Sequence, residues 1–264
     1  MKKKIDLLAI IGLAFGVGAV LGAMYFKGVP VSSFNNPAAL LVIFAGTLAT
    51  ILISFTGKEL GKIGGIFGSV FNDTEYQSNK ELIQMFLELT QKARKEGLLS
   101  LEPEVEKIDD IFLKKGLRMV VDGLDSELIE GTLELDIESM EERHGTNASV
   151  FSSAGAYAPT LGVLGAVFGL IAAMGSINDT ENMSHAIAAA FMATILGIFT
   201  GYVMWNPFAG KLKVKTKHEA HYKHMLIEGI LCLQKGEPAA VVKNRLLAMI
   251  PRAEQEIFEK EDGK

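Results

Sequence analysis

The sequence predicts an all-α, polytopic membrane protein with four transmembrane helices and helical cytoplasmic regions. Hydrophobic residues make up 49% of its 264 residues. Charged residues are absent from 28–57 and 145–178, and His185 is the one Asp, Glu, Lys, Arg or His residue in 182–210. A soluble domain needs charge along its whole surface, so this segregation excludes an ordinary globular protein and also a disordered chain. The single cysteine, Cys232, excludes an internal disulfide framework.

Four windows are long and apolar enough to cross a bilayer, which takes about 20 residues in a helix. The windows are 7–26, 37–56, 153–176 and 185–206. The first follows three lysines, as a signal peptide does, but its apolar run is longer and lacks a small-residue cleavage site. We therefore expect a retained first span.

The placement of lysine and arginine predicts the orientation of the spans, because these residues concentrate on the cytoplasmic side. Three lysines precede span one, and 11 Lys and Arg residues lie in each of the segments 57–150 and 207–264. The two short loops between spans hold one such residue and none. We expect a cell-membrane protein with both termini in the cytoplasm. Its segments are spans one and two (1–56), a helical cytoplasmic domain (57–150), spans three and four (151–206) and a helical tail (207–264).

Apolar residues recur at helical spacing in both cytoplasmic segments. An amphipathic helix is predicted by Leu82, Phe86, Leu89 and Ala93. A helix that runs toward span three is predicted by Ile129, Leu133, Ile137 and Met140. A helix on the inner membrane surface is predicted by Leu60, Ile63, Phe67 and Val70. Gly97 and Pro103 mark a break between two helices. We expect no strands.

Spans three and four each carry a stripe of small residues at helical spacing. The stripes are Gly155, Pro159, Gly162, Ala166, Gly169, Ala173 and Ser176, and Ala186, Ala190, Thr194, Gly197 and Gly201. Small residues allow helix backbones to approach closely in lipid. One stripe is explained as well by packing within the chain as by packing on another molecule. Two stripes on the last two spans favour a surface that faces helices from outside the chain.

The spans carry no ionisable side chain at mid-depth, since Asp6 precedes span one and His185 lies at the outer mouth of span four. Ion passage through a membrane protein usually requires a buried acid or histidine, so a partner would have to supply it. His218, His221 and His224 are three apart, and a solvated helix face explains them better than a metal site does. We expect no metal, cofactor or catalytic site, and the net charge of −5 argues against nucleic acid.

Several runs of the sequence resemble the MotA family of flagellar motor stator subunits, within the MotA/TolQ/ExbB proton channel family. The runs are YAPTLGVLGAVFGL at 157–170, AFMATILGIFTGY at 190–202, WNPF at 205–208, NPAA at 36–39, AGT at 45–47 and RKEGLLSLE at 94–102. Together they cover nearly the whole chain, in the family's order and with its topology.

The resemblance implies that the chain forms a homopentamer around a dimer of MotB, whose membrane helix carries the missing aspartate. Ion flow past that aspartate then drives rotation and torque on the rotor protein FliG. The implied ion path and partner-helix face comprises Thr194, Ala166, Pro159, Gly162, Gly169 and Pro207, and the implied rotor interface comprises Arg94 and Glu102. Sodium-driven members carry a threonine where this chain has Ala166, and protons are therefore the expected ion.

Three alternatives stay open at this point. A subunit of an ExbB/TolQ-like energising ion pump resembles the last two spans, but such subunits typically have three spans. A self-contained channel or transporter would need its own polar site at mid-depth and usually an inverted repeat or broken helices. A membrane enzyme would need a catalytic cluster. The sequence shows no polar site at mid-depth, no inverted repeat and no catalytic cluster.

Overall fold

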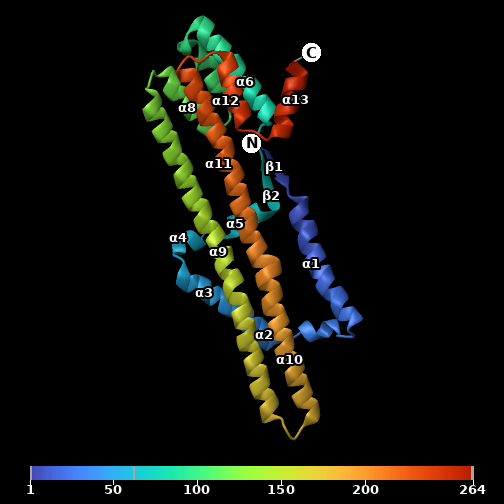
Figure 1. The fold of residues 1–264 in the computed structure, drawn as a ribbon. Helices are drawn as coiled ribbons and strands as arrows, with labels where there is room; N and C mark the ends of the chain where they lie inside the picture. Colours follow the sequence, from blue (N-terminus) through green and yellow to red (C-terminus); the bar gives the residue numbers. More distant parts are fainter. Residues whose placement is uncertain (1, 62, 263–264) are drawn as a thin grey trace. The chain divides into compact units, whose positions relative to one another are not determined.

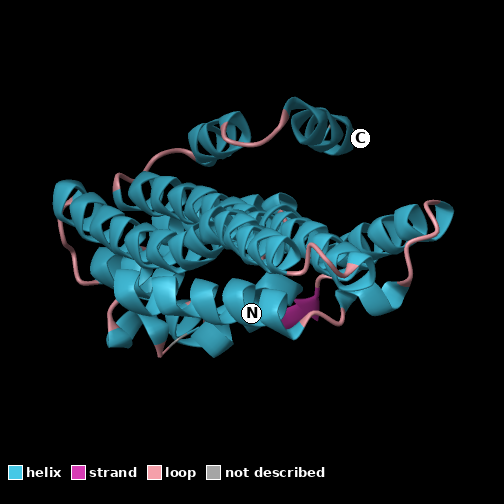
Figure 2. Cartoon of the chain, turned by 90° about the horizontal axis from the view of Figure 1, so that it is seen from below, coloured by secondary structure: helices cyan, strands magenta, loops and turns pink. Residues whose placement is uncertain are grey.

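A computed structural model describes residues 2–61 and 63–262, and it is almost wholly helical (Figures 1 and 2). Four helical runs are long and apolar enough to cross a membrane. They are α1 (Leu7–Phe26); α2 (Pro37–Leu40) with the π-helix η2 (Leu41–Ala45) and α3 (Gly46–Ser54); α9 (Ser126–Gly175); and α10 (Thr180–Phe199) with the π-helix η4 (Thr200–Trp205) and α11 (Asn206–Gln234). The predicted fold class is confirmed.

The remaining elements are shorter. They are β1 (Lys2–Ile5), η1 (Val31–Phe34), α4 (Gly57–Leu60), α5 (Ile63–Phe71), β2 (Asn72–Glu75), α6 (Asn79–Glu96), η3 (Leu98–Leu101), α7 (Glu102–Lys107), α8 (Ile111–Val121), α12 (Ala239–Ala248) and α13 (Arg252–Asp262). Strands β1 and β2 pair in a two-stranded sheet, drawn in magenta in Figure 2. Four-residue strands are too short to show an alternating pattern, and the expectation of no strands was wrong here.

Large apolar side chains on the spans point away from the protein. The side chains of Leu8, Phe15 and Ile53 are 77%, 80% and 86% exposed. Leaving apolar area in water costs about 25 cal/mol per Å², whereas contact of the same surface with lipid tails carries no such cost. The exposure on these helices therefore supports a multi-pass membrane protein.

The chain divides into two compact units. The charged unit holds Thr74–Glu142 and the chain from Thr216 onward, together with the first residues. Its core is built from the apolar faces of α6, α8, α9, α11 and α12. Fully buried members include Phe86, Leu117, Leu133, Ile137, Leu226, Ile230 and Leu246. The predicted helical faces of α6 and α9 are thus confirmed as core.

Local sequence signals set the ends of the helices in the charged unit. At α6, Ser78 Oγ accepts from the Glu81 amide at 3.2 Å, and Glu81 accepts from the Ser78 amide at 3.0 Å. This capping box satisfies two backbone donors at once. Helix α6 ends before Gly97, whose φ of 87° favours glycine. Pro103 lies in the first turn of α7, where the missing N–H costs nothing.

The apolar unit comprises Lys4–Asp73 and Arg143–Lys215. Helix α5 buries Ile66 and Val70 against Phe151 of α9 and Phe208 of α11, while Phe67 of the same helix is 38% exposed. The protein itself thus covers part of the apolar surface of α5, and the position of this helix on the inner membrane surface stays a prediction.

The buried face of α9 in the charged unit can be tested with one matched pair of variants. Leu133 is fully buried, whereas Leu135 on the same helix is 65% exposed. Leu133→Ala should lower the free energy of unfolding by about 2–5 kcal/mol through lost transfer energy and a cavity. Leu135→Ala should stay within about 0.5 kcal/mol. Thermal unfolding of the full chain in detergent measures both, and equal effects would contradict the assigned core.

Candidate functional site

Spans three and four lie side by side in the ribbon (Figure 1). Small residues bring their backbones close together. A Cβ atom added to Gly162 would lie 2.9 Å from the carbonyl oxygen of Ala193 and 2.9 Å from the Cα atom of Gly197. One added to Gly169 would lie 2.8 Å from the Cβ atom of Ala190. Backbone atoms cannot move aside as a flexible side chain can, so the observed approach requires glycine at Gly162. We call Gly155, Pro159, Gly162, Gly165 and Gly169 of α9, with Ala190, Ala193, Gly197 and Gly201 of span four, the glycine seam.

Within this chain, Gly162 and Gly169 both approach span four. Gly162 is buried there, whereas Gly169 stays partly exposed, so the expected contact of this stripe with a partner's helix stays a prediction. The small residues are used for close packing inside the hairpin of the two spans, where no hydrophobic force draws helices together. Packing within the chain was the alternative reading of each stripe.

Ala166 and Thr194 lie beside the glycine seam. The stripes expected from the sequence had placed both residues among the packing residues. The contact residues are their neighbours: a Cβ atom on Gly165 would lie 3.2 Å from the Cβ atom of Ala193. Successive residues on a helix are rotated by about 100°, and Ala166 and Thr194 are correspondingly half-exposed. The Thr194 hydroxyl donates to the carbonyl oxygen of Ala190 at a long 3.4 Å. Both residues therefore remain accessible from outside the seam.

The two prolines lie where the helix pattern of the spans changes. Pro159 is inside α9 and has no N–H for the carbonyl of Gly155. Gly201 packs against this break, because a Cβ atom there would lie 2.6 Å from Pro159 Cγ and 2.9 Å from the Gly155 oxygen. Gly201 belongs to the π-helix η4, and exposed Pro207 follows η4 as the second residue of α11. π-Helical turns within long helices often mark functional sites.

Arg94 and Glu102 flank the break between α6 and α7. Arg94 is in the last turn of α6, Glu102 is the first residue of α7, and both are exposed. Between them, Leu99 is 73% exposed. Nearby, Lys92 and Lys107 pair with Glu104 at 3.0 and 3.2 Å. Within the described chain neither Arg94 nor Glu102 has an ion-pair partner, so both charges are available to another molecule.

The three histidines of α11 differ in their surroundings. His224 Nδ1 lies 3.2 Å from Glu134 Oε1, while His218 and His221 are exposed. Among residues 2–61 and 63–262, no group of three or more His, Cys, Asp or Glu side chains could hold a metal ion. His218 and His221 thus lie on a solvated helix face, and His224 is half-buried beside Glu134.

Sequence reasoning missed the roles of Gly165 and Ala193 and the two π-helices. The spacing of Ala190, Ala193, Gly197 and Gly201 is as helical as the stripe that was chosen, so the alternative register was visible. A π-helix, by contrast, adds one residue to a turn without a distinct sequence signal. It was therefore found from the structure.

The close approach at Gly162 predicts that even an alanine is not tolerated there, although an alanine is tolerated elsewhere on the same helix. Gly162→Ala should push spans three and four apart and lower the free energy of unfolding by about 1–3 kcal/mol, the cost of overpacking. Gly145→Ala on the same helix has open space around it and should be tolerated. Thermal unfolding in detergent and the amount of chain in the membrane are the measurements. A Gly162→Ala variant as stable as the Gly145→Ala variant would contradict the seam.

Comparisons with known proteins agree with this architecture. Residues 10–97 match the motility protein A N-terminal family, and residues 104–225 match the MotA/TolQ/ExbB proton channel family. The chain is 47% identical to motility protein A of Bacillus subtilis over 93% of this chain and 91% of that protein.

Two solved structures are also similar. The chain superposes on a subunit of the flagellar MotAB stator complex from Bacillus subtilis with a TM-score of 0.91 and 46% identity, covering 96% of this chain and 99% of that one. For the C. jejuni MotAB structure the TM-score is 0.87 at 27% identity, covering 94% and 97%. The four spans, the glycine seam and these matches place the chain in the MotA/TolQ/ExbB proton channel family, as a member of its motility protein A group of flagellar stator subunits.

Proposed function

We propose that this chain is the stator subunit that, with a MotB-type partner, couples ion flow across the cell membrane to rotation and torque on the rotor. The observation that carries the proposal is the whole-length match to motility protein A, including the N-terminal family over 10–97. An ExbB/TolQ-like pump subunit is less favoured, because the four spans and the segment between spans two and three correspond to the motility type. On this proposal the chain is a mechanical transducer and not an enzyme.

The partner is proposed to bring the carboxylate that the spans lack. Ions stripped of water are costly at mid-membrane, and the related solved structures are complexes of MotA with MotB. We propose that Ala166, Thr194, Pro159 and Pro207 line the surface past which the ion moves. The half-exposed positions of Ala166 and Thr194 support this assignment. Gly169 and Pro159 belong to the glycine seam but are partly exposed, and they are proposed to border the same surface, whereas Gly162 is buried against span four.

The assembly is proposed to be a pentamer of this chain around two partner helices in the cytoplasmic membrane. The excess of lysine and arginine on the N-terminus, the central segment and the tail supports cytoplasmic termini. On this topology the charged unit lies in the cytoplasm, where Arg94 and Glu102 would meet the rotor protein FliG.

Ion flux should require the partner. Liposomes that contain the full chain alone should conduct no more protons than empty liposomes, since no acid lies at mid-depth in its spans. Liposomes with the chain and its MotB-type partner should conduct, and changing the partner's membrane aspartate to asparagine should stop the flux. Flux from the chain alone would contradict the proposal.

The rotor interface is tested by reversing charge. Exposed ion pairs are individually weak, so neutralising Arg94 or Glu102 alone should only reduce torque. Arg94→Glu with Glu102→Lys should abolish torque while partner-dependent ion flux persists. Charge reversals on FliG should restore part of the motion. Failure of every reversal to rescue swimming would exclude direct charge pairing.

The identity of the ion is tested by removing sodium. Ala166 offers no side-chain oxygen, and sodium needs several oxygen ligands once it sheds its water. We therefore expect protons to drive the motor. Swimming of a stator-less host that carries this chain and its partner should persist without sodium at fixed pH and stop with a protonophore. Dependence on sodium with resistance to the protonophore would overturn the assignment.

A further inference from the structure

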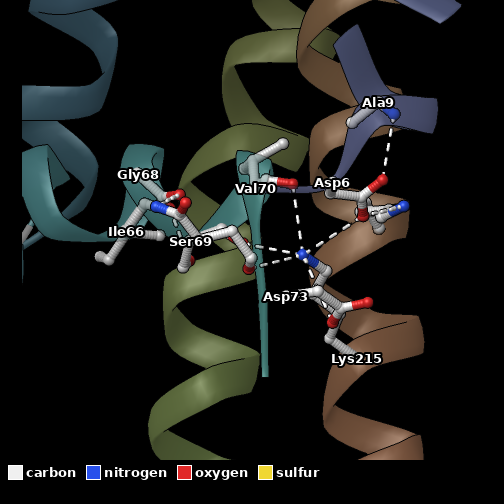
Figure 3. Close-up of polar contacts among 10 residues, drawn as sticks. Asp6, Ala9, Ile66, Gly68, Ser69, Val70, Asp73 and Lys215 are labelled. Atoms are coloured by element: carbon white, nitrogen blue, oxygen red, sulfur yellow. Dashed lines mark hydrogen bonds and ion pairs between the residues drawn. The ribbon is translucent and has the colours of Figure 1, made fainter. Parts of the chain in front are cut away.

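A buried carboxylate joins the start of span one to the helix that continues span four. Asp6 is only 8% exposed, and its Oδ2 lies 2.5 Å from Lys211 Nζ and 3.6 Å from Lys215 Nζ (Figure 3). Asp6 also caps α1, because its Oδ1 accepts from the Ala9 amide at 3.1 Å. The hydrogen bond from Lys211 holds the pKa of Asp6 below its ordinary value, so the carboxylate stays charged at neutral pH. We call Asp6, Lys211 and Lys215 the ionic junction.

The ionic junction also holds the end of α5. The last four carbonyls of a helix have no partner inside it. Lys215 Nζ donates to the carbonyl oxygens of Ser69 at 3.0 Å and Val70 at 3.3 Å, and to that of Asn72 just beyond the helix at 2.9 Å. The Asp6 amide donates to the carbonyl of Phe71 at 2.8 Å.

The fourth of these carbonyls, that of Gly68, accepts from the Asn72 side-chain amide at 2.9 Å. Every terminal carbonyl of α5 thus has a donor. A cation at a helix C-terminus is further favoured by the helix dipole. Lys215 is therefore a cap supplied by α11. Its charge is balanced by Asp6 at 3.6 Å, which is buried, and by Asp73 at 3.9 Å, which is exposed.

Helix α5 in turn packs on the inner end of span four. Phe67 and Phe71 of α5 contact Phe208 with ring centroids 5.7 and 5.5 Å apart. Trp205, the last residue of η4, contacts Phe208 at 6.3 Å and stacks on Phe151 of α9 at 6.0 Å. These five side chains form one aromatic cluster at the end of the π-helix.

Span one meets the same segment from another side. A Cβ atom on Gly16 would lie 2.5 Å from Val203 Cγ1, so α1 and η4 touch at this point. Leu13 of α1 packs beside the aromatic cluster. The ionic junction thus fixes α1, which touches the π-helix η4 directly, and α5, which reaches Trp205 of η4 through Phe208.

We propose that Asp6 and Lys215 are positioning residues for the inner end of span four: they anchor α1 and α5 so that these elements hold η4 and Trp205 in place for ion passage. The inference rests on the proposed function, in which this part of span four borders the ion path. Neither residue touches the ion. Their effect reaches the path through the aromatic cluster and the contact between Gly16 and Val203.

Trp205 is the only tryptophan of the chain, and its fluorescence therefore reports on the aromatic cluster directly. Lys215→Met removes the ammonium group but keeps an apolar stem, and Asp6→Asn removes the buried balancing charge with little change of shape. In the purified full chain, both variants should shift Trp205 emission to longer wavelength and increase its quenching by iodide. Partner-dependent proton flux and swimming speed should fall, with the chain level in the membrane unchanged.

Matched variants separate positioning from general damage. Lys213→Met removes an exposed lysine from the same helix and should change neither reading. Lys215→Arg should retain the cation and restore most of the wild-type emission, flux and speed. Asp6→Lys with Lys211→Asp should recover more of both readings than Asp6→Lys alone.

Each reading can overturn the proposal. Unchanged Trp205 emission in both Lys215→Met and Asp6→Asn would show that the ionic junction does not hold the segment. A shifted emission with normal flux and speed would show that its position does not matter for ion passage. Absence of partner-dependent flux in the wild-type chain would instead refute the proposed function, and the fluorescence reading would still decide whether the ionic junction positions Trp205.

Discussion

The close approach of two backbones at Gly162 and Gly197 is the constraint on which the rest of the apolar unit depends. In lipid, helices gain nothing from hiding apolar surface from each other, so contact must come from packing and from weak polar interactions. Glycine at both positions brings the Gly162 backbone within van der Waals reach of the Ala193 carbonyl. With α9 and α10 fixed as a pair, the remaining spans can pack around a defined surface.

That pairing explains the arrangement of the polar and apolar residues around it. The contact between the two spans is made by the residues of the glycine seam. Ala166 and Thr194 beside it therefore remain half-exposed and offer a surface without charge. Large apolar side chains cover the lipid-facing sides of the spans. On the proposed function, a pair of helices that is held internally and has no acid at mid-depth would suit a subunit whose partner supplies the carboxylate. At the end of span four that contains the π-helix η4, the helix is less regular. There the ionic junction and the aromatic cluster hold spans three and four in place.

The spans, the long helix α9 and the cytoplasmic helices could be predicted because each depends on local pattern: apolar length, 3.6-residue spacing, and breaks at Gly97 and Pro103. The sequence could not predict which surface each helix face packs against. Gly162 is equally small whether it meets a partner or its own chain, and Ala193 differs from Thr194 by one step along the helix. Asp6 was visible at the start of span one, but Lys215 lies more than 200 positions away, and only the fold brings them together.

The most direct test of the glycine seam is disulfide trapping between spans three and four. Gly165 and Ala193 place their Cβ positions 3.2 Å apart, close to the separation of about 3.8 Å found in disulfides. In a Cys232→Ser background, Gly165→Cys with Ala193→Cys should form a bond within one chain on mild oxidation, without cross-linked dimers on a denaturing gel. Bonds between chains, or none at all, would show that the two spans do not pack on each other within one subunit.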